Sequence, residues 1–277
     1  MSIDTSEAQS EVVAISEVVP HARLGTATNF SSGHGANCGT YGVRFAQSAQ
    51  DLESVFRLRF RVFNLELNEG LESAYQYGQD RDAFDDVCDH LIVEHRPTAR
   101  VVGTYRLQSG PTASNNIGFY SEREFNFAAY EPLRDSLVEL GRACIDREHR
   151  SFEVLTLLWR GVAAYASGRG ARYLIGCSSL NSQNPQEGSD MYWGLQSFLV
   201  DAPFRTMPRT GFRIPIVSAT APTFEVKPPR LLRGYLSIGA QICGEPAIDR
   251  EFKTIDFLTL LDLNRLASPM RARLMPR

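Results

Sequence analysis

Charged side chains interrupt an apolar segment in the middle of the chain. The segment LVELGRACI (137–145) has the character of a buried strand, yet it contains Glu139 and Arg142. A buried charge costs free energy unless it is paired or takes part in chemistry. One interpretation is a structural ion pair with a neighbouring strand, for example between Glu139 and Arg106. The other is a reaction cleft, in which a buried carboxylate with a raised pKa could act as a general base.

The period of two in a strand predicts which of these side chains share a face. It places Glu139, Gly141 and Ala143 on one side of the sheet, and Leu140, Arg142 and Cys144 on the other. A predicted helix follows directly, after the basic segment DREHR (146–150). Free N–H groups at a helix start attract anions, and arginine pairs well with phosphate. Arg147 and Arg150 therefore belong either to a solvated basic turn, which spacing alone favours, or to a phosphate site.

An acidic loop precedes the first long apolar strand of the chain. Its carboxylates are Asp80, Asp82, Asp85, Asp86 and Asp89, with Cys88 and His90 among them. No metal-ligand spacing such as HExxH or an EF-hand loop is present, so we expect no metal. The loop is either solvated or attracts a cationic small molecule. The chain also lacks the GxSxG, P-loop and GxGxxG motifs, which disfavours a covalent hydrolase and a dinucleotide enzyme.

The overall composition is that of an ordinary globular protein. The chain has 277 residues, 43% of them hydrophobic and 22% charged, with a net charge of −3. This balance gives no general affinity for nucleic acid. The five cysteines form no CxxC pair, which is typical of reduced, buried thiols in a cytoplasmic protein. We see neither a signal peptide nor an apolar run long enough to span a bilayer, so any membrane contact would be peripheral.

Hydrophobic periodicity predicts an α/β (α+β) fold with a mixed central sheet flanked by helices on both faces. We expect a flexible leader at 1–40, a catalytic core at 41–200 and a C-terminal extension packed on the core at 201–277, ending in a basic tail. Strands are predicted at 41–47, 91–96, 100–108, 137–145, 172–180 and 254–263, and helices at 48–67, 119–127, 151–170, 188–200 and 229–239. Phe56, Phe60, Phe63 and Leu67 would line the buried face of the first helix.

Several stretches together resemble one enzyme family. LRFRVFNLEL, DAFDDVCDHLIV, VVGTYRL and VELGRACIDREHR are similar to the acyl carrier protein-dependent branch of the GNAT N-acyltransferases, the hemolysin-like or ornithine N-acyltransferase family. Acyl-homoserine lactone synthases are a sister branch with the same landmarks. The resemblance covers residues 41 to 265 and implies a GNAT-like sheet. In its first helix, Arg59 and Arg61 are both candidates for the family's arginine.

One departure from the ordinary GNAT pattern concerns the donor. GNATs that use acetyl-CoA carry R/Q-x-x-G-x-G/A at the loop that wraps the CoA diphosphate, and here Arg150 and Phe152 fill both glycine positions. A bulky side chain prevents the close backbone approach that glycine permits. The acyl-phosphopantetheine of an acyl carrier protein presents a single phosphate. The departure therefore favours that donor, with no bound cofactor.

The resemblance implies a direct attack of an amine on a thioester and assigns roles to residues. Glu139 and Arg142 would be catalytic, with Glu139 as the general base. Arg61, Phe63, Asp82, Asp85 and Arg106 would bind the acceptor, an ornithine-like amino acid. Ala143, Cys144, Ile145, Arg147 and Arg150 would bind the donor arm or the carrier protein, with the first three supplying backbone N–H groups to the oxyanion.

We therefore expect a cytoplasmic enzyme, peripheral at the inner membrane face at most, that moves a (3-hydroxy)fatty acyl group to the α-amine of ornithine. The product would be lyso-ornithine lipid. The alternatives are an N-acyl amino acid or acyl-homoserine lactone synthase on the same fold. An alternative of another class is a non-catalytic lipid- or carrier-binding or membrane-active protein.

Overall fold

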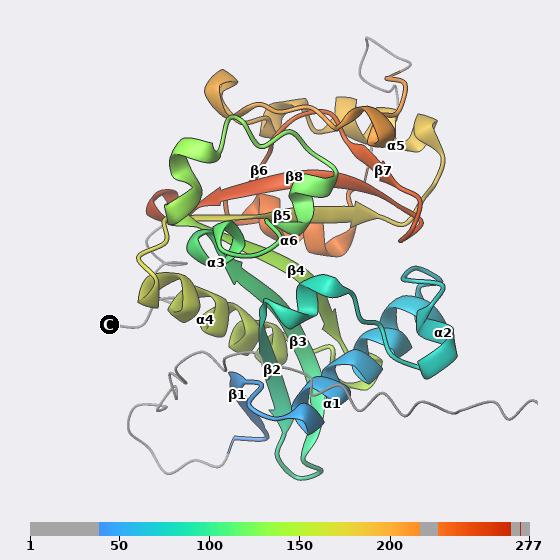
Figure 1. The fold of residues 1–277 in the computed structure, drawn as a ribbon, viewed down its shortest axis with the longest axis vertical. Coiled ribbons are helices and arrows are strands. Elements are labelled where there is room, and N and C mark those ends of the chain that lie inside the picture. The colour runs from blue at the N-terminus through green and yellow to red at the C-terminus, as the bar shows by residue number, and fades with distance from the viewer. Residues whose placement is uncertain (1–38, 217–226, 267–271, 273–277) are drawn as a thin grey trace, which may run out of the picture.

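A single eight-stranded sheet forms the centre of the computed structural model, which describes residues 39–216, 227–266 and 272 (Figure 1). Its strands run in the order β1-β2-β3-β4-β5-β8-β6, and β7 pairs with β8. The strands are β1 (Tyr41–Phe45), β2 (Asp89–His95), β3 (Arg100–Ser109), β4 (Leu137–Ile145), β5 (Tyr173–Leu180), β6 (Gln241–Ile242), β7 (Ala247–Asp249) and β8 (Thr254–Asp262). Only β4 and β5 are parallel neighbours.

The helices connect and cover these strands. The α-helices are α1 (Ala49–Arg59), α2 (Ala74–Tyr77), α3 (Gly110–Ser114), α4 (Phe152–Gly168), α5 (Pro185–Gly194) and α6 (Arg230–Ser237). Ser48 caps α1, and Ser151 caps α4, each through a side-chain oxygen that accepts a backbone N–H. Short 3₁₀ helices include η2 (Ala83–Asp86), η3 (Tyr120–Arg123), η4 (Glu131–Ser136) and η5 (Arg147–His149). The predicted antiparallel hairpin is confirmed as β2 and β3.

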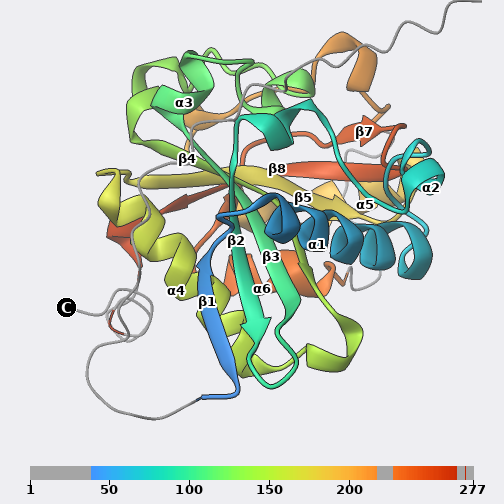
Figure 2. The same cartoon turned by 60° about the horizontal axis from the view of Figure 1, so that its bottom comes forward.

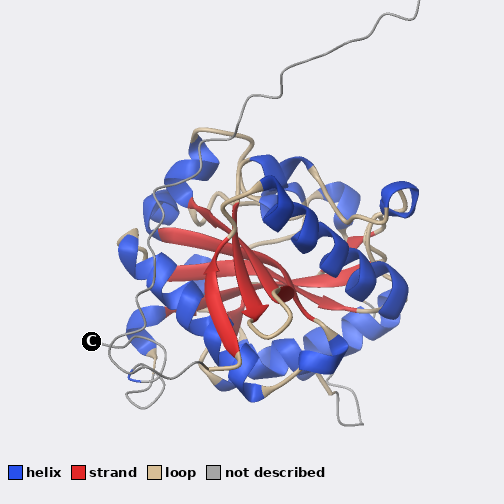
Figure 3. Cartoon of the chain, turned by 90° about the horizontal axis from the view of Figure 1, so that it is seen from below, coloured by secondary structure: helices blue, strands red, loops and turns tan. Residues whose placement is uncertain are grey.

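Alternation along β2 directs side chains to two different cores. Leu91 and Val93 pack with Leu158 of α4, whereas Ile92 packs with Leu58 of α1. The two helices therefore cover opposite faces of the sheet, as Figure 2 shows (α1 blue, α4 yellow-green). Figure 3 shows helices around the whole sheet, which confirms the predicted fold class.

A β-bulge in β4 overturns the predicted division of its side chains. Arg106 of β3 faces Gly141 and Thr104 faces Cys144, so Tyr105 opposes two residues, Arg142 and Ala143. Arg142 has φ +48°, the left-handed conformation that bulges use. The extra residue shifts the alternation by one. Arg142 therefore lies on the α1 face together with Glu139, and Ala143 packs in the core on the α4 face.

β4 and β5 pair over only three residues, from Leu137 with Tyr173 to Glu139 with Ile175. Beyond this point the two strands separate, so the β5-facing edge of β4 from Leu140 onward has no paired strand. Gly176 lies where they part. A Cβ atom at this position would lie 2.2 Å from the Leu140 carbonyl oxygen, so only glycine allows this close approach.

Two other expectations changed. The predicted helix at 48–67 is α1 followed by a π-helical segment, Phe60–Glu66, in which the Leu67 N–H bonds the Val62 carbonyl five residues earlier. Val55, Phe56, Leu58, Arg59 and Val62 are the buried positions. Of the expected stripe, Phe60 and Phe63 are partly buried against neighbouring core clusters, whereas Leu67 is exposed. The predicted leader at 1–40 lies almost wholly outside the described residues.

The predicted extension contributes to the central sheet. β8 pairs antiparallel with β5 along its whole length, and β6 and β7 add to β8. Among the described helices, none combines the length and the apolar character that crossing a bilayer requires.

The close approach at Gly176 yields a stability prediction. Gly176→Ala should lower the free energy of unfolding by about 1–3 kcal/mol, because the new methyl group overlaps a backbone oxygen. Gly168→Ala is the matched control. It lies in the last turn of α4 with open space around it, and should be neutral or stabilise by about 0.4–1 kcal/mol. Chemical denaturation measures both, and equal stabilities would contradict the prediction.

Candidate active site

A cluster of buried ion pairs lies on the α1 face of the sheet. It contains three arginines and three aspartates: Arg59, Arg106, Arg142, Asp80, Asp82 and Asp85. They come from α1, β3, β4 and the loop before β2. The positive and negative charges are equal in number, so the cluster as a whole needs no further ion.

Arg59 is the fully buried centre of the cluster. Its Nε donates to Asp80 Oδ1 at 2.7 Å, and its two terminal nitrogens donate to Asp85 at 2.6 and 3.1 Å. A bidentate guanidinium–carboxylate pair offsets much of the cost of burying both charges. It holds the pKa of Asp85 well below its usual range, against the opposing effect of burial. The structure thus places Arg59, rather than Arg61, in the cluster.

Arg106 and Arg142 both hold Asp82. Arg106 Nη1 donates to Asp82 Oδ1 at 2.6 Å and to Asp85 Oδ1 at 3.1 Å, and Arg142 Nη2 donates to Asp82 Oδ2 at 2.9 Å. Both guanidinium groups lie over the Tyr120 ring, and Arg142 lies 3.6 Å from the Phe252 ring centroid. The aromatic faces stabilise these cations in place of water.

Local sequence explains why the acidic loop takes this shape. Asp82 caps η2 by accepting the Phe84 N–H, and Asp85 reaches back to accept the Asp82 N–H. This capping box fixes both carboxylates toward the arginines. His90 Nε2 lies 3.3 Å from the Asp85 carbonyl oxygen, and burial lowers the pKa of His90 to about 4, so the ring is neutral at neutral pH.

Glu139 is buried beside this cluster but is held by backbone and hydroxyl donors. Its Oε2 accepts the Tyr120 N–H at 2.8 Å, and its Oε1 accepts the Ser121 N–H at 2.9 Å and the Ser121 hydroxyl. The suggested ion pair between Arg106 and Glu139 is absent from the described contacts, because Arg106 is occupied by Asp82 and Asp85. Burial raises the pKa of Glu139, although the Ser121 and Tyr120 donors oppose it.

The predicted donor residues lie at the other end of β4. Arg61, Arg100, Arg147, Asp146, Glu66, Glu148 and Val62 line a hollow of about 400 Å³. Arg61 and Arg100 each lie 3.4 Å from Asp146 Oδ2. Arg150 is bound bidentately to Glu66, at 2.5 and 2.7 Å. Arg147 is exposed and forms no ion pair with another described residue.

The predicted site residues thus fall into two groups. Glu139, Arg142, Arg106, Asp82 and Asp85 surround Tyr120. Arg61 and Arg147 line the hollow, and Arg150 binds Glu66 at its edge, so Arg61 lies with the predicted donor residues and not with the acceptor-binding residues to which it was assigned. The unpaired edge of β4 (140–145) lies between the two groups. Phe63 packs partly buried on the α1 side, and Cys144 is buried there. The roles assigned to these residues remain predictions. Asp82 and Asp85 in particular already pair with arginines, so their carboxylates are not free to bind an acceptor.

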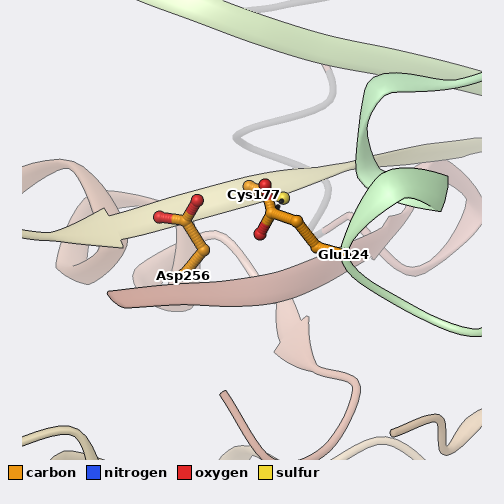
Figure 4. A group of neighbouring side chains, drawn as sticks. All are labelled: Glu124, Cys177 and Asp256. Carbon is orange, nitrogen blue, oxygen red and sulfur yellow. Dashed lines mark hydrogen bonds between the residues drawn. The ribbon is translucent and has the colours of Figure 1, made fainter. Parts of the chain in front are cut away.

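The structure contains a second buried acidic cluster, which we did not predict from the sequence. Glu124 follows η3, Cys177 lies on β5 just past the strand separation, and Asp256 lies on β8 (Figure 4). Asp249 on β7 is close enough to raise the pKa of Asp256 further. Glu124 was predicted within a short helix (119–127), and Asp256 within the strand TIDFLTLLDL (254–263). An acidic residue within such a strand is the one signal that could have pointed to it.

Comparisons with known proteins agree with this architecture. Residues 58–160 match the family model described as "Acetyltransferase (GNAT) domain". The L-ornithine N(alpha)-acyltransferase of Brucella abortus (strain 2308) is 33% identical over 253 residues, which cover 83% of this chain and 87% of that protein. The protein of the same name from Agrobacterium fabrum (strain C58 / ATCC 33970) is 31% identical and covers 83% of each chain.

Among solved structures, the AHL synthase LasI matches with a TM-score of 0.49 and 12% identity, over 86% of this chain and 96% of that one. The resemblance inferred from the sequence motifs is confirmed by the curated relatives. Because the identity to them extends over most of both chains, this protein belongs to the L-ornithine N(alpha)-acyltransferase family and is an acyltransferase with a GNAT domain.

Proposed function

We propose that this protein transfers a (3-hydroxy)fatty acyl group from acyl carrier protein to the α-amine of ornithine, which gives lyso-ornithine lipid. The observation that carries the proposal is the identity to relatives named L-ornithine N(alpha)-acyltransferase over most of their length. The separation of β4 and β5 beside two clusters of buried charge supports it, because it leaves an unpaired strand edge next to groups that can bind a charged amino acid.

In the proposed reaction the amine nitrogen bonds to the thioester carbon as the carbon–sulfur bond breaks. The ammonium of the acceptor must first lose a proton. Glu139 is our proposed general base, and a raised pKa suits this role. Three hydrogen bonds already occupy its carboxylate, so the proton would pass through a water to the remaining lone pair of Oε2. The departing sulfur takes up a proton as the thiol of the phosphopantetheine arm.

The unpaired edge of β4 would stabilise the oxyanion of this reaction. Past Glu139 the strand has no β5 partner, so N–H groups within Ala143–Ile145 that face this edge would be available as donors. Arg142 would bind the acceptor carboxylate. Its Nε is buried without a hydrogen-bond partner, at 3.4 Å from Asp80 Oδ1.

For the donor, we propose that the hollow beside Asp146 receives the single phosphate of the phosphopantetheine arm. Arg147 is the strongest candidate, because it pairs with no carboxylate of the described residues, whereas Arg150 pairs with Glu66. Arg61 and Arg100 line the same hollow and would add positive charge. Acidic groups on the carrier protein surface would be attracted by the same three arginines.

We further propose a cytoplasmic enzyme that releases its product at the inner membrane surface. The predicted basic tail would make that contact. Arg265 belongs to the described residues, but Arg271, Arg273 and Arg277 of the tail lie outside them.

The function is tested by supplying purified protein with 3-hydroxyacyl carrier protein and ornithine. We expect a product with the mass of N-acylornithine that keeps a free side-chain amine after derivatisation. Lyso-ornithine lipid should also appear in lipid extracts of cells expressing the protein. An acylated lactone formed with S-adenosylmethionine, or no product with any amino acid, would contradict the proposal.

Glu139→Gln should lower kcat about 10²–10⁴-fold, because the amide cannot accept the proton. The amide also weakens the hold on Tyr120 and Ser121, so thermal unfolding must be measured in parallel. Ser121→Ala is the matched control, since it removes one hydrogen bond to Glu139 and leaves the carboxylate in place. If Glu139→Gln and Ser121→Ala lower kcat equally, Glu139 only positions the η3 segment.

Arg147→Ala should raise the KM for acyl carrier protein about tenfold and leave the KM for ornithine unchanged, because a charged hydrogen bond contributes about 1.5–3 kcal/mol. The effect should weaken at high salt, as expected for an exposed cation. Arg57→Ala is the control, since Arg57 is also exposed and pairs with Glu53 on α1, away from the hollow. An unchanged KM for the carrier protein would exclude Arg147 from the donor site.

A further inference from the structure

The second acidic cluster lies at the point where β4 and β5 separate. Ile175 is the last residue of β5 that pairs with β4, and Cys177 lies two positions beyond it on the same face of the strand. Asp256 lies opposite Ser179 in the antiparallel pair of β5 and β8, so it shares that face. Glu124 reaches the two strands from the segment that covers them, as Figure 4 shows. The three side chains bring ligand atoms within 4.8 Å of one another.

These carboxylates form no ion pair with any described residue, although the charge of Arg123, which pairs with Glu251, partly opposes the raised pKa of Glu124. Glu124, Asp249 and Asp256 are 1%, 4% and 3% exposed. No ion pair within the described part of the chain includes any of them, or the partly exposed Glu69, whose pKa is raised to about 7 by burial and by Asp256. Several buried carboxylates without a counter-charge are unfavourable, which is why burial raises the pKa of Asp256 to about 6 and that of Glu124 well above its usual range.

The second acidic cluster also contains buried oxygen atoms that accept no hydrogen bond. Glu124 Oε1 and Asp256 Oδ1 are buried without a hydrogen-bond partner, and so is the hydroxyl of Thr254, two residues before Asp256 on the same face of β8. Thr254 is 2% exposed and carries no charge, so its hydroxyl adds a neutral polar oxygen next to Asp256. An unmade hydrogen bond at a buried polar atom is costly. A group with several N–H donors and a positive charge would satisfy all three oxygens.

Tyr120 separates this cluster from the arginines. Its ring lies under Arg106 and Arg142, and its hydroxyl donates to Asp249 Oδ2 at 2.7 Å. The first cluster is already balanced by its own three arginines, whereas the carboxylates of the second form no ion pair with a described residue, and their neighbour Arg123 pairs with Glu251 instead. A ligand that spans Tyr120 would meet an arginine on one side and uncompensated carboxylates on the other. Amino acids with a carboxylate and a distant ammonium have this distribution of charge.

We propose that Glu124 and Asp256 bind the side-chain ammonium of the acceptor and so select a dibasic amino acid. The inference rests on the proposed function, because it assigns binding residues to that acceptor. It places the side-chain ammonium of the acceptor at the second acidic cluster, and not at Asp82 and Asp85 as the sequence predicted. The three N–H donors of a primary ammonium match the unpartnered oxygens of Glu124, Asp256 and Thr254 in number.

A divalent metal is the competing occupant, and the state of Cys177 argues against it. Metals bind the thiolate. Burial and the neighbouring Glu124 raise the pKa of the Cys177 thiol well above its ordinary value. The thiol instead donates to Glu124 Oε2, at 3.8 Å. An ammonium leaves this hydrogen bond intact.

The test compares binding of ornithine and norvaline, which has the same carbon chain without the side-chain amine. By calorimetry without an acyl donor, the wild type should bind ornithine at least tenfold more tightly. Glu124→Gln and Asp256→Asn should each weaken ornithine binding about tenfold or more and leave norvaline binding unchanged. Glu72→Gln is the matched control, since Glu72 is an exposed carboxylate paired with Lys253.

Thermal unfolding without ligand provides the second measurement. Each of the two amide variants should unfold at a higher temperature than the wild type at neutral pH, because the amide removes an uncompensated buried charge. The sign follows from the raised pKa values. When a carboxyl group has a higher pKa in the folded state than in the unfolded state, the folded protein loses stability as the pH rises above the pKa of the unfolded state. Greater stability together with weaker ornithine binding excludes misfolding as the cause.

Equal binding of the two amino acids by the wild type, no binding of ornithine, or an unchanged preference in both variants would overturn the inference. A stoichiometric divalent metal in the purified protein would also overturn it. If only the proposed function is wrong, the result differs: the protein binds ornithine more tightly than norvaline but forms no acylated product. Acylated ornithine without that preference refutes this inference alone.

Discussion

The structure around the site depends on the burial of Arg59 between Asp80 and Asp85. One guanidinium joins α1 to the acidic loop, and the same aspartates and Asp82 hold Arg106 of β3 and Arg142 of β4. Such a network adds little net stability over an apolar core, but loss of one member leaves an unpaired buried charge, at a cost of about 3–5 kcal/mol. The network therefore fixes the relative positions of the strand, the helix and the loop.

The bulge at Arg142 is the second constraint, and it depends on the first. A regular strand would direct Arg142 into the apolar core on the α4 face, where no carboxylate lies among the residues of that core. The left-handed backbone at Arg142 reverses its side chain, and Asp82 together with the rings of Tyr120 and Phe252 then holds it. Glu139 secures Tyr120 from the same strand. The two charges that interrupt an otherwise apolar segment thus act on one side of the sheet.

Charge in this region is unevenly distributed, and the unevenness suggests how a substrate is bound. The cluster around Arg59 is neutral, whereas Glu124, Asp249 and Asp256 form no ion pair with a described residue, because the neighbouring Arg123 pairs with Glu251. Natural proteins keep such unfavourable groups where function requires them, at the expense of stability. The separation of β4 and β5 adjoins both clusters, which supports acyl transfer between a thioester at the strand edge and an amine held by the carboxylates.

The sequence by itself determined the class of fold, the hairpin of β2 and β3, the helix α4 and the family, because these depend on local periodicity and on motifs contiguous in the chain. The family resemblance assigned Glu139, Arg142, Arg106, Asp82 and Asp85 to one active site, although strand alternation placed Glu139 and Arg142 on opposite faces of the sheet. Only the tertiary structure decided which charges pair, since Arg59 and Arg61 are indistinguishable by type and differ only in the direction that their positions on the helical turns give them. The same holds for the bulge that reverses Arg142, and for the meeting of Glu124, Cys177 and Asp256. Those three residues are up to 132 positions apart (124 to 256) and come together through strand register alone, which no local pattern encodes.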